Sequence, residues 1–420
     1  MKDDTREKRR PLTYFRYLLL ACVAGLVISL GVAMTPRPAP EPPEPAFSEQ
    51  ARASALETSL RLRSSAQVLA EAAPEAQQAA FTRVVTLLTT QAKALLPAGT
   101  ATSDPSASAK VPPSETAPSA TSPEPSPSAT AAAASAGELV AGLSASGVQR
   151  TSDAVAADGG MARLLAAVGT AQLLEASAFA GAVGIPAPEA TVTGLTPEDA
   201  KQLKGGTPDC VASLSAAGAS AAPPAGPPAP QTADSPSARS GEPGQGGLGQ
   251  QGPLLAAALS MTVKTEAETV YGYQVALTRL EKSNTQSASS LMERHEQLLQ
   301  EAEELSRLHC VETPHQEPGY SLKPEFLQAP AAGLASLEAE TLPVYADLVA
   351  LSEGPARRWA IAGLWEAARR SVQWGADPGA VPGVLFNVDQ LPPLPDETAA
   401  DDELPNDETA ADDETADEQS

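Results

Sequence analysis

The chain has 420 residues, of which 40 are Pro and 30 are Gly, while only 4% are aromatic. This composition predicts long disordered stretches, because such segments cannot bury enough apolar surface to offset the entropy of the chain. The 52 acidic and 28 basic residues give a net charge of −24. That balance excludes nucleic acid as the expected partner, because binding it depends on neutralising phosphates.

The N-terminus carries the features of a membrane anchor. Residues 1–16 are basic, and residues 17–34 form an uncharged apolar run. Eighteen residues at about 1.5 Å each are near the lower limit for crossing a bilayer, and basic flanks stay on the cytoplasmic side. We therefore predict a single-pass signal anchor in the cell membrane, with the N-terminus in the cytoplasm and the rest of the chain outside.

Three other interpretations of this segment stay open. The small residues Gly31-Val32-Ala33 could be cut by signal peptidase, and the protein would then be secreted. The run Leu19-Leu20-Ala21-Cys22 is similar to a lipoprotein acceptor site, and Arg9-Arg10 is similar to a twin-arginine signal. All of these routes end outside the cytoplasmic membrane.

Helical and low-complexity segments then alternate. Residues 35–46 form a Pro-rich spacer, 47–97 a helical hairpin, 98–136 a low-complexity linker, 137–212 an Ala-rich helical region broken at Gly159-Gly160, and 213–252 a second disordered linker. Residues 387–420 form an acidic tail, in which one eight-residue unit occurs at 396–403 and again at 407–414. Its negative charges repel one another, so we expect the tail to stay unfolded.

Residues 253–386 carry the longest helical periodicity. Apolar side chains recur at spacings of three and four around 259–277, 288–309, 334–351 and 361–372. This pattern predicts four antiparallel helices, so the fold class is all-α, with a C-terminal four-helix bundle preceded by Ala-rich helical pairs. The last helix should bury one stripe of residues, namely Ile361, Leu364, Trp365, Ala368 and Val372.

Two ionisable side chains, Glu266 and His295, fall within the apolar seams of this bundle. A buried charge is costly unless it is paired, so we expect Tyr273 to satisfy His295 and an Arg or a backbone group to satisfy Glu266. A turn centred near Asn284 would keep Glu266 and His295 about 10 Å apart along the axis. In the third helix, Glu338 should only flank the seam.

Several motifs follow one another along this region. They are Glu-Ala-Glu-Thr-Val-Tyr-Gly-Tyr at 266–273, then His295, Tyr345-x-x-Leu348-Val349, Trp365-x-x-Ala368 and Trp374-Gly375. In their order and spacing they resemble a domain of unknown function found in actinobacterial envelope proteins and placed in the ferritin-like superfamily. The resemblance covers about Leu254–Phe386. It implies a ferritin-like four-helix bundle and brings no established activity.

The wider superfamily often binds two irons through one Glu from each of two helices and Glu-x-x-His from each of the others. This chain departs from that pattern, because Glu293 stands two residues before His295 and Glu366-x-x-Arg369 lacks a His. The candidate ligands for iron or another metal are Glu266, His295 and Glu338. The seams hold only one carboxylate, Glu266, and one imidazole, His295, which are too few for a di-iron centre. We therefore predict no cofactor, with iron or another metal as the alternative.

Cys210 and Cys310 are the cysteines beyond the membrane segment, and they are candidates for a disulfide because thiols outside the cytoplasm tend to oxidise. The sequence contains no catalytic motif that we can identify. We therefore expect a membrane-anchored extracytoplasmic protein that binds or scaffolds an envelope protein or a ligand without catalysis. Two alternatives stay open, an atypical ferritin-like metal-binding protein or oxidase, and a carrier of an apolar small ligand.

Overall fold

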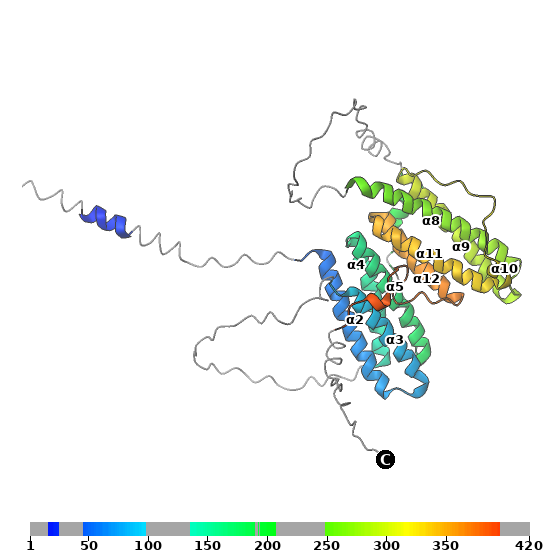
Figure 1. The fold of residues 1–420 in the computed structure, drawn as a ribbon, viewed down its shortest axis with the longest axis horizontal. Coiled ribbons are helices and arrows are strands. Elements are labelled where there is room, and N and C mark those ends of the chain that lie inside the picture. Colours follow the sequence, from blue (N-terminus) through cyan, green and yellow to red (C-terminus); the bar gives the residue numbers. More distant parts are fainter. Residues whose placement is uncertain are drawn as a thin grey trace, which may run out of the picture. The chain divides into compact units, whose positions relative to one another are not determined.

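The computed structural model describes residues 16–24, 45–97, 135–189, 192, 194–206 and 248–394. The described residues are all-α, with no strand among them, so the predicted fold class is confirmed (Figure 1). The chain divides into residues 1–45 and 46–420. In the first unit, residues 16–24 form a helix with exposed apolar side chains such as Tyr17 and Leu20. The remainder of the predicted anchor, much of both linkers and the acidic repeats lie outside the described residues.

Four helices make up what we call the N-terminal bundle. They are α2 (Phe47–Ala72), α3 (Glu75–Leu95), α4 (Ala136–Ala156) and α5 (Gly159–Val183). The pairs α2–α3 and α4–α5 pack on each other, and Phe81 meets Phe179 edge to face with ring centroids 4.9 Å apart. A Cβ on Gly169 would lie 2.7 Å from the carbonyl oxygen of Gly147. The absence of side chains at these two positions therefore lets α4 and α5 approach closely.

The break between α4 and α5 lies earlier than we expected. The predicted break was Gly159-Gly160, but both residues belong to the first turn of α5. Asp158 is the N-cap, because its side chain accepts a hydrogen bond from the backbone N–H of Met161. A Cβ at Gly159 would lie only 2.1 Å from the carbonyl oxygen of Ala350. This glycine therefore serves close packing within a helix rather than helix termination.

The second set of elements follows α6 (Pro197–Gly205), a short helix with a capping box between Thr196 and Asp199. The C-terminal bundle consists of α8 (Leu248–Leu277), α9 (Lys282–Leu308), α11 (Pro330–Leu351) and α12 (Gly354–Gln373). A one-turn helix, α10 (Pro324–Gln328), precedes α11, and the 3₁₀ turn η2 (Val388–Gln390) follows α12. In α8–α12 the helices lie side by side in Figure 1 and share a core.

The two bundles also share a core, because α5 packs against α11 and α12. Arg357 of α12 donates to the carbonyl oxygen of Ala157 at 2.6 Å, and Arg163 of α5 pairs with Asp347 of α11 at 2.7 Å. Helix α5 is long and apolar enough to cross a membrane, and 72% of its most apolar window is buried. A core helix between two bundles needs the same composition.

The segment after α12 runs back across the N-terminal bundle. The carbonyl oxygen of Ala380 accepts from Gln91 of α3 at 2.9 Å, and that of Gly383 accepts from Arg163 at 2.7 Å. Val381 is buried against the shared core. These contacts tie residues 376–394 to both bundles.

Helix α9 ends at a residue with a left-handed backbone. Cys310 has φ +58°, and the N–H of Val311 reaches the carbonyl oxygen of Ser306, while the N–H of Cys310 reaches that of Arg307. This is a Schellman motif, which usually has glycine at the left-handed position. Cys310 is disulfide-bonded, and its predicted partner Cys210 lies outside the described residues.

Candidate functional site

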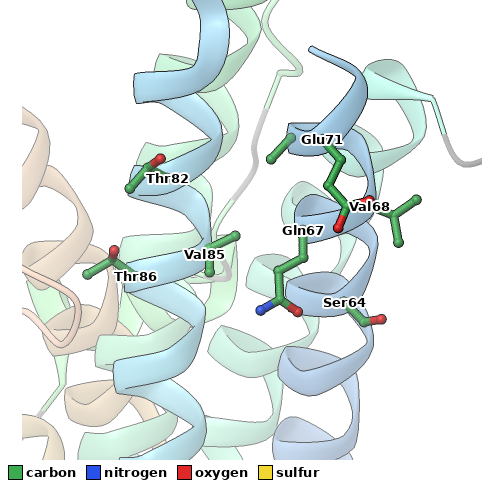
Figure 2. Close-up of a pocket in the computed structure, with 8 residues that line it drawn as sticks. Ser64, Gln67, Val68, Glu71, Thr82, Val85 and Thr86 are labelled. Atoms are coloured by element: carbon green, nitrogen blue, oxygen red, sulfur yellow. The ribbon is translucent and has the colours of Figure 1, made fainter.

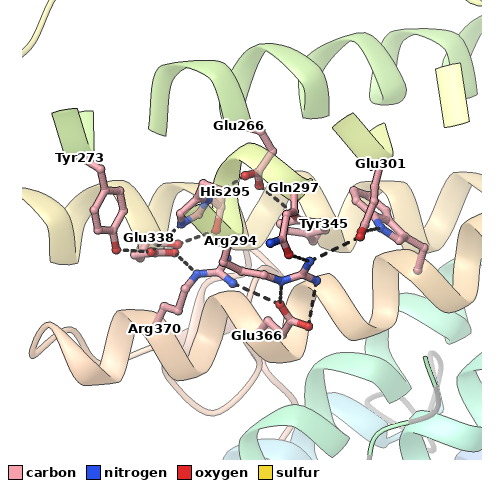
Figure 3. A network of polar contacts seen from close by, with 12 residues as sticks. Glu266, Tyr273, Arg294, His295, Gln297, Glu301, Glu338, Tyr345, Glu366 and Arg370 are labelled. Carbon is pink, nitrogen blue, oxygen red and sulfur yellow. Dashed lines mark hydrogen bonds and ion pairs between the residues drawn. The ribbon is translucent and has the colours of Figure 1, made fainter. Parts of the chain in front are cut away.

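A cluster of charged side chains lies in the middle of the C-terminal bundle (Figure 3). We call it the ion cluster, and each helix contributes one member, Glu266 from α8, His295 from α9, Glu338 from α11 and Arg370 from α12. Their exposed fractions are 1%, 0%, 0% and 4%. Groups so deeply buried must satisfy one another, because water cannot do so.

His295 joins the two carboxylates. Its Nδ1 lies 2.7 Å from Oε2 of Glu266, and its Nε2 lies 2.9 Å from Oε1 of Glu338. An ionised carboxylate only accepts hydrogen bonds, so both ring nitrogens must carry a proton. Burial alone lowers the pKa of His295, but Glu266 and then Glu338 outweigh it and raise the pKa. The imidazole is therefore a cation held between two anions.

Glu338 has the largest number of partners in the cluster. Besides His295, it accepts from the hydroxyl of Tyr273 at 2.7 Å and from Nε of Arg370 at 2.9 Å. Burial raises the pKa of Glu338, but Arg370 and then His295 outweigh it and lower the pKa to about 2. Trp374 donates to the hydroxyl of Tyr273 at 2.8 Å and so extends the network towards the end of α12.

Glu266 is held from the other side by Tyr345, whose hydroxyl donates to Oε1 at 2.7 Å. Burial, and then the carboxylate of Glu266, raise the pKa of Tyr345 well above its usual value. Burial and Glu338 act in the same direction on the pKa of Tyr273. Both phenols therefore remain protonated donors, and the cluster as a whole has two negative and two positive charges.

A second row of charges surrounds this cluster. Arg294 of α9 binds Glu366 of α12 through two hydrogen bonds of 2.8 and 3.1 Å, and it also lies 3.4 Å from Glu301. Glu301 accepts from the indole N–H of Trp359 at 2.6 Å. These contacts join α9 to α12, and Arg370 links the two rows through an ion pair of 3.6 Å with Glu366.

The predicted separation of Glu266 and His295 is wrong, because the turn between α8 and α9 lies earlier than expected. Helix α8 ends at Leu277 and α9 begins at Lys282, so the turn is centred about four residues before Asn284. Moving the centre of an antiparallel turn by four residues shifts the facing residue by eight, about 12 Å along the axis. That shift brings Glu266 level with His295. The turn contains no Gly or Pro that would have marked its position.

The expected partners are wrong for the same reason. Tyr273 lies beside His295, with ring centroids 5.2 Å apart, but its hydroxyl bonds Glu338. Glu266 has Tyr345 and His295 as partners instead of an Arg or a backbone group.

Glu338 lies in the seam of α11 and does not flank it. The residues that face the core at spacings of four and three are almost fully buried, and they are Leu334, Glu338, Thr341, Tyr345 and Leu348 of α11 and its C-cap Ser352. The apolar seam that the sequence pattern favours has Leu337, Val344 and Leu351 in place of Glu338, Tyr345 and Ser352. Its other three members are the same. Hydrophobicity alone therefore favoured the wrong half of the pattern.

The predicted core stripe of the last helix, α12, is also partly wrong. Ile361, Leu364 and Ala368 are buried, but Val372 is 46% exposed and Trp365 is only half-buried. The buried face of α12 also includes a row of small residues and one arginine, namely Ala356, Ala360, Gly363, Ala367 and Arg370, and the half-buried C-cap Trp374 continues this row. A Cβ on Gly363 would lie 2.2 Å from the ring of Tyr345, so this row must be small there. The spacing of four and three could have identified Arg370, which the sequence analysis missed.

The structure brings all three candidate metal ligands together, yet their arrangement does not fit a metal. Both nitrogens of His295 bond carboxylates, and Arg370 supplies a second cation from the fourth helix. Over the described residues, no group of three or more His, Cys, Asp or Glu side chains is placed to hold a metal ion. Metal binding would require His295 to lose a proton and give up one of its carboxylate partners, and it would require Arg370 to leave Glu338.

A hollow of about 630 Å³ lies between α2 and α3, far along the chain from the ion cluster (Figure 2). Its lining consists of short polar or aliphatic side chains, with Glu71 as the one charged residue and Val68 largely exposed. Nothing in this lining selects a ligand, so we assign it no function.

Residues 258–385 match a family model described as a domain of unknown function (DUF4439). Comparisons with curated proteins and with solved structures found no match. The matched residues include all four members of the ion cluster and most of α8, together with α9, α11 and α12. The predicted resemblance to a domain-of-unknown-function family is thereby confirmed for this segment of the chain.

Proposed function

We propose that this chain is a non-catalytic binding or scaffolding protein of the cell envelope, with the segment at 17–34 as its membrane anchor. The proposal that the protein is non-catalytic rests on the surroundings of His295. Both nitrogens of this side chain bind carboxylates within a buried ion cluster of zero net charge. A general base or a metal ligand needs a free lone pair within reach of its substrate. His295 offers neither a lone pair nor access.

We also propose that residues 253–386 form a ferritin-like bundle, as found in actinobacterial envelope proteins. One side chain from each of four helices meets at mid-bundle, which is where ferritin-like proteins place their metal ligands. In this chain two protein cations, His295 and Arg370, balance the two carboxylates. The ion cluster would then fix the register of the four helices without a metal.

The anchor rests on the basic residues at 1–16 and the apolar run at 17–34. Membrane fractionation, followed by protease treatment of intact cells, tests it. The chain should sediment with membranes, and residues after 45 should be cleaved from outside. Recovery in the cytoplasmic fraction would contradict this part of the proposal.

The non-catalytic role is tested by metal analysis of the full chain purified under native conditions, together with oxygen and peroxide consumption. We expect far less than one metal per chain and no turnover. A stoichiometric redox metal with oxygen consumption would overturn the proposal. The meeting of Glu266, His295 and Glu338 favours a metal-binding protein as the second candidate. If that candidate is right, His295→Ala should abolish the bound metal.

A further inference from the structure

A wide hollow lies between the two bundles. It has a volume of about 1190 Å³ and is lined by α3 and α5 on the N-terminal side and by α9 and α12 on the C-terminal side. We call it the inter-bundle groove. Small-ligand sites in proteins typically measure about 300–1,000 Å³, so the groove can hold a ligand of that size.

Two ion pairs in the groove are already complete. Nε of Arg83 lies 3.0 Å from both carboxylate oxygens of Glu175, and Arg294 binds Glu366 through two hydrogen bonds. Each of these acids therefore neutralises an arginine of the groove. Neither arginine is free to bind a further anion without giving up its carboxylate.

Two other arginines that line the groove have N–H groups that are not bound to a carboxylate of the described residues. Arg369 is exposed and lies over the ring of Trp365, 5.6 Å from its centroid, and the described part of the chain offers it no carboxylate. The side chain of Arg370 is 5% exposed, and its Nη2 has no hydrogen-bond partner among the described residues. This atom is buried, so a ligand can reach it only if the side chains that cover it move. An acceptor would then be stabilising, because a buried N–H of a charged group without one is costly.

The same groove has an apolar surface beside these arginines. Trp365 and Leu291 are half-buried, and Val372 is 46% exposed. Leu87 and Leu174 contribute from the opposite bundle. A ligand that covers these side chains gains from apolar burial.

We propose that the inter-bundle groove binds an amphiphilic monocarboxylate, with its carboxylate at Arg369 and Arg370 and its apolar body against Trp365 and Val372. The planar guanidinium matches the two oxygens of a carboxylate. A single negative charge is favoured over a doubly charged phosphate, because Glu189 and Asp377 also line the groove and would repel the larger charge. This inference rests on the proposed non-catalytic binding role and specifies its ligand.

A carboxylate of this kind can be a free organic acid or the C-terminus of an apolar peptide. Calorimetric titration of the full chain in lipid nanodiscs separates the two, with 4-phenylbutyrate as one probe and N-acetylated trileucine as the other. Each probe has an uncharged counterpart, 4-phenylbutanol and the peptide amide. We expect at least about tenfold tighter binding of a charged probe than of its counterpart, because a hydrogen bond to a charged group is worth that much.

Three variants locate the site. Arg369→Gln removes the exposed cation and Val372→Glu adds a negative charge beside it, and each should weaken binding of the carboxylate at least about fivefold. Arg279→Gln is the matched control, because Arg279 is exposed and does not line the groove. Its affinity should equal that of the unmodified chain.

The inference is overturned if each charged probe binds no better than its uncharged counterpart. It is also overturned if Arg369→Gln and Arg279→Gln bind the probes equally well. Binding of the acid alone identifies a small organic ligand, and binding of the free peptide alone identifies a chain terminus. Loss of the inference leaves the non-catalytic role intact, since that role is judged by metal content and turnover and not by these titrations.

Discussion

Arg370 provides the sharpest test of the ion cluster. Arg370→Met keeps most of the side-chain volume and removes the cation 2.9 Å from Glu338. Two unit charges at that distance attract by about 6 kcal/mol at an effective dielectric constant of about 20. Part of this is offset because Met does not carry the cost of burying a guanidinium. Breaking a buried pair from one side costs about 3–5 kcal/mol, and we expect a loss of free energy of unfolding in that range.

The measurement is urea unfolding of the full chain at neutral pH, followed by circular dichroism at 222 nm. Glu338→Gln and the double variant complete the cycle, because Gln still accepts from Tyr273 while it lacks the charge. If the pair interacts as described, the double variant should lose about 1–3 kcal/mol less than the sum of the single variants. Arg369→Met, at the exposed neighbouring position, should change stability by less than about 0.5 kcal/mol. A loss below about 1 kcal/mol in Arg370→Met, or additive losses, would refute the reasoning.

Three further predictions concern pH, close packing and the aromatic core. The pKa of Glu338 is lowered from 4.5 to about 2, so the stability that this carboxylate contributes is complete above pH 4.5 and is lost as pH falls towards 2. The pKa of His295 is raised, so the stability that its charged form contributes is complete below pH 6.5 and is lost as pH rises through the folded-state pKa. In urea unfolding across pH, His295→Gln should remove the alkaline decline, and an unchanged profile would contradict the charge we assign. Gly363→Ala pushes against the ring of Tyr345 and should cost about 1–3 kcal/mol, whereas Gly181→Ala meets no atom within 4 Å and should stabilise by up to about 1 kcal/mol, both read from melting curves. Trp359→Ala should cost about 3–5 kcal/mol because that ring is 3% exposed, and a loss below about 1 kcal/mol would show that it is not in the core.

Hydrophobic periodicity was sufficient to predict the helices, because one face of each helix contacts the core and the opposite face contacts solvent. The predicted hairpin at 47–97 and the four stretches after residue 253 all fall on helices. The periodicity could not specify which of two overlapping seams faces the core. In α11 both candidates alternate by three and four, and the polar one is buried because Glu338 finds partners on three other helices. These partners are far from Glu338 in the sequence, so the periodicity of α11 alone cannot reveal them.

The pairing of Glu266 with His295 depended on one turn. In an antiparallel hairpin every facing pair is set by the turn centre, so an error of four residues changes all of them. Leu280 packs against the core near the turn, and Glu281 is the N-cap of the next helix, yet neither residue type marks a turn by itself. Residue composition therefore located the candidate ligands, while contacts between helices decided what they bind.

Arg370 connects the ion cluster to the inter-bundle groove, and this position makes the two proposals mutually informative. Its Nε is committed to Glu338, its Nη1 lies 3.6 Å from Glu366, and its Nη2 has no partner among the described residues. Nη2 is buried, so a carboxylate reaches it only if the side chains that cover it move, and it would then add an acceptor without displacing Glu338. Ligand binding should then stabilise the fold, by about 2.7 kcal/mol at one hundred times the dissociation constant. In Arg370→Met the fold loses its ion pair and the groove loses this donor, so added carboxylate should recover less stability there than in the unmodified chain.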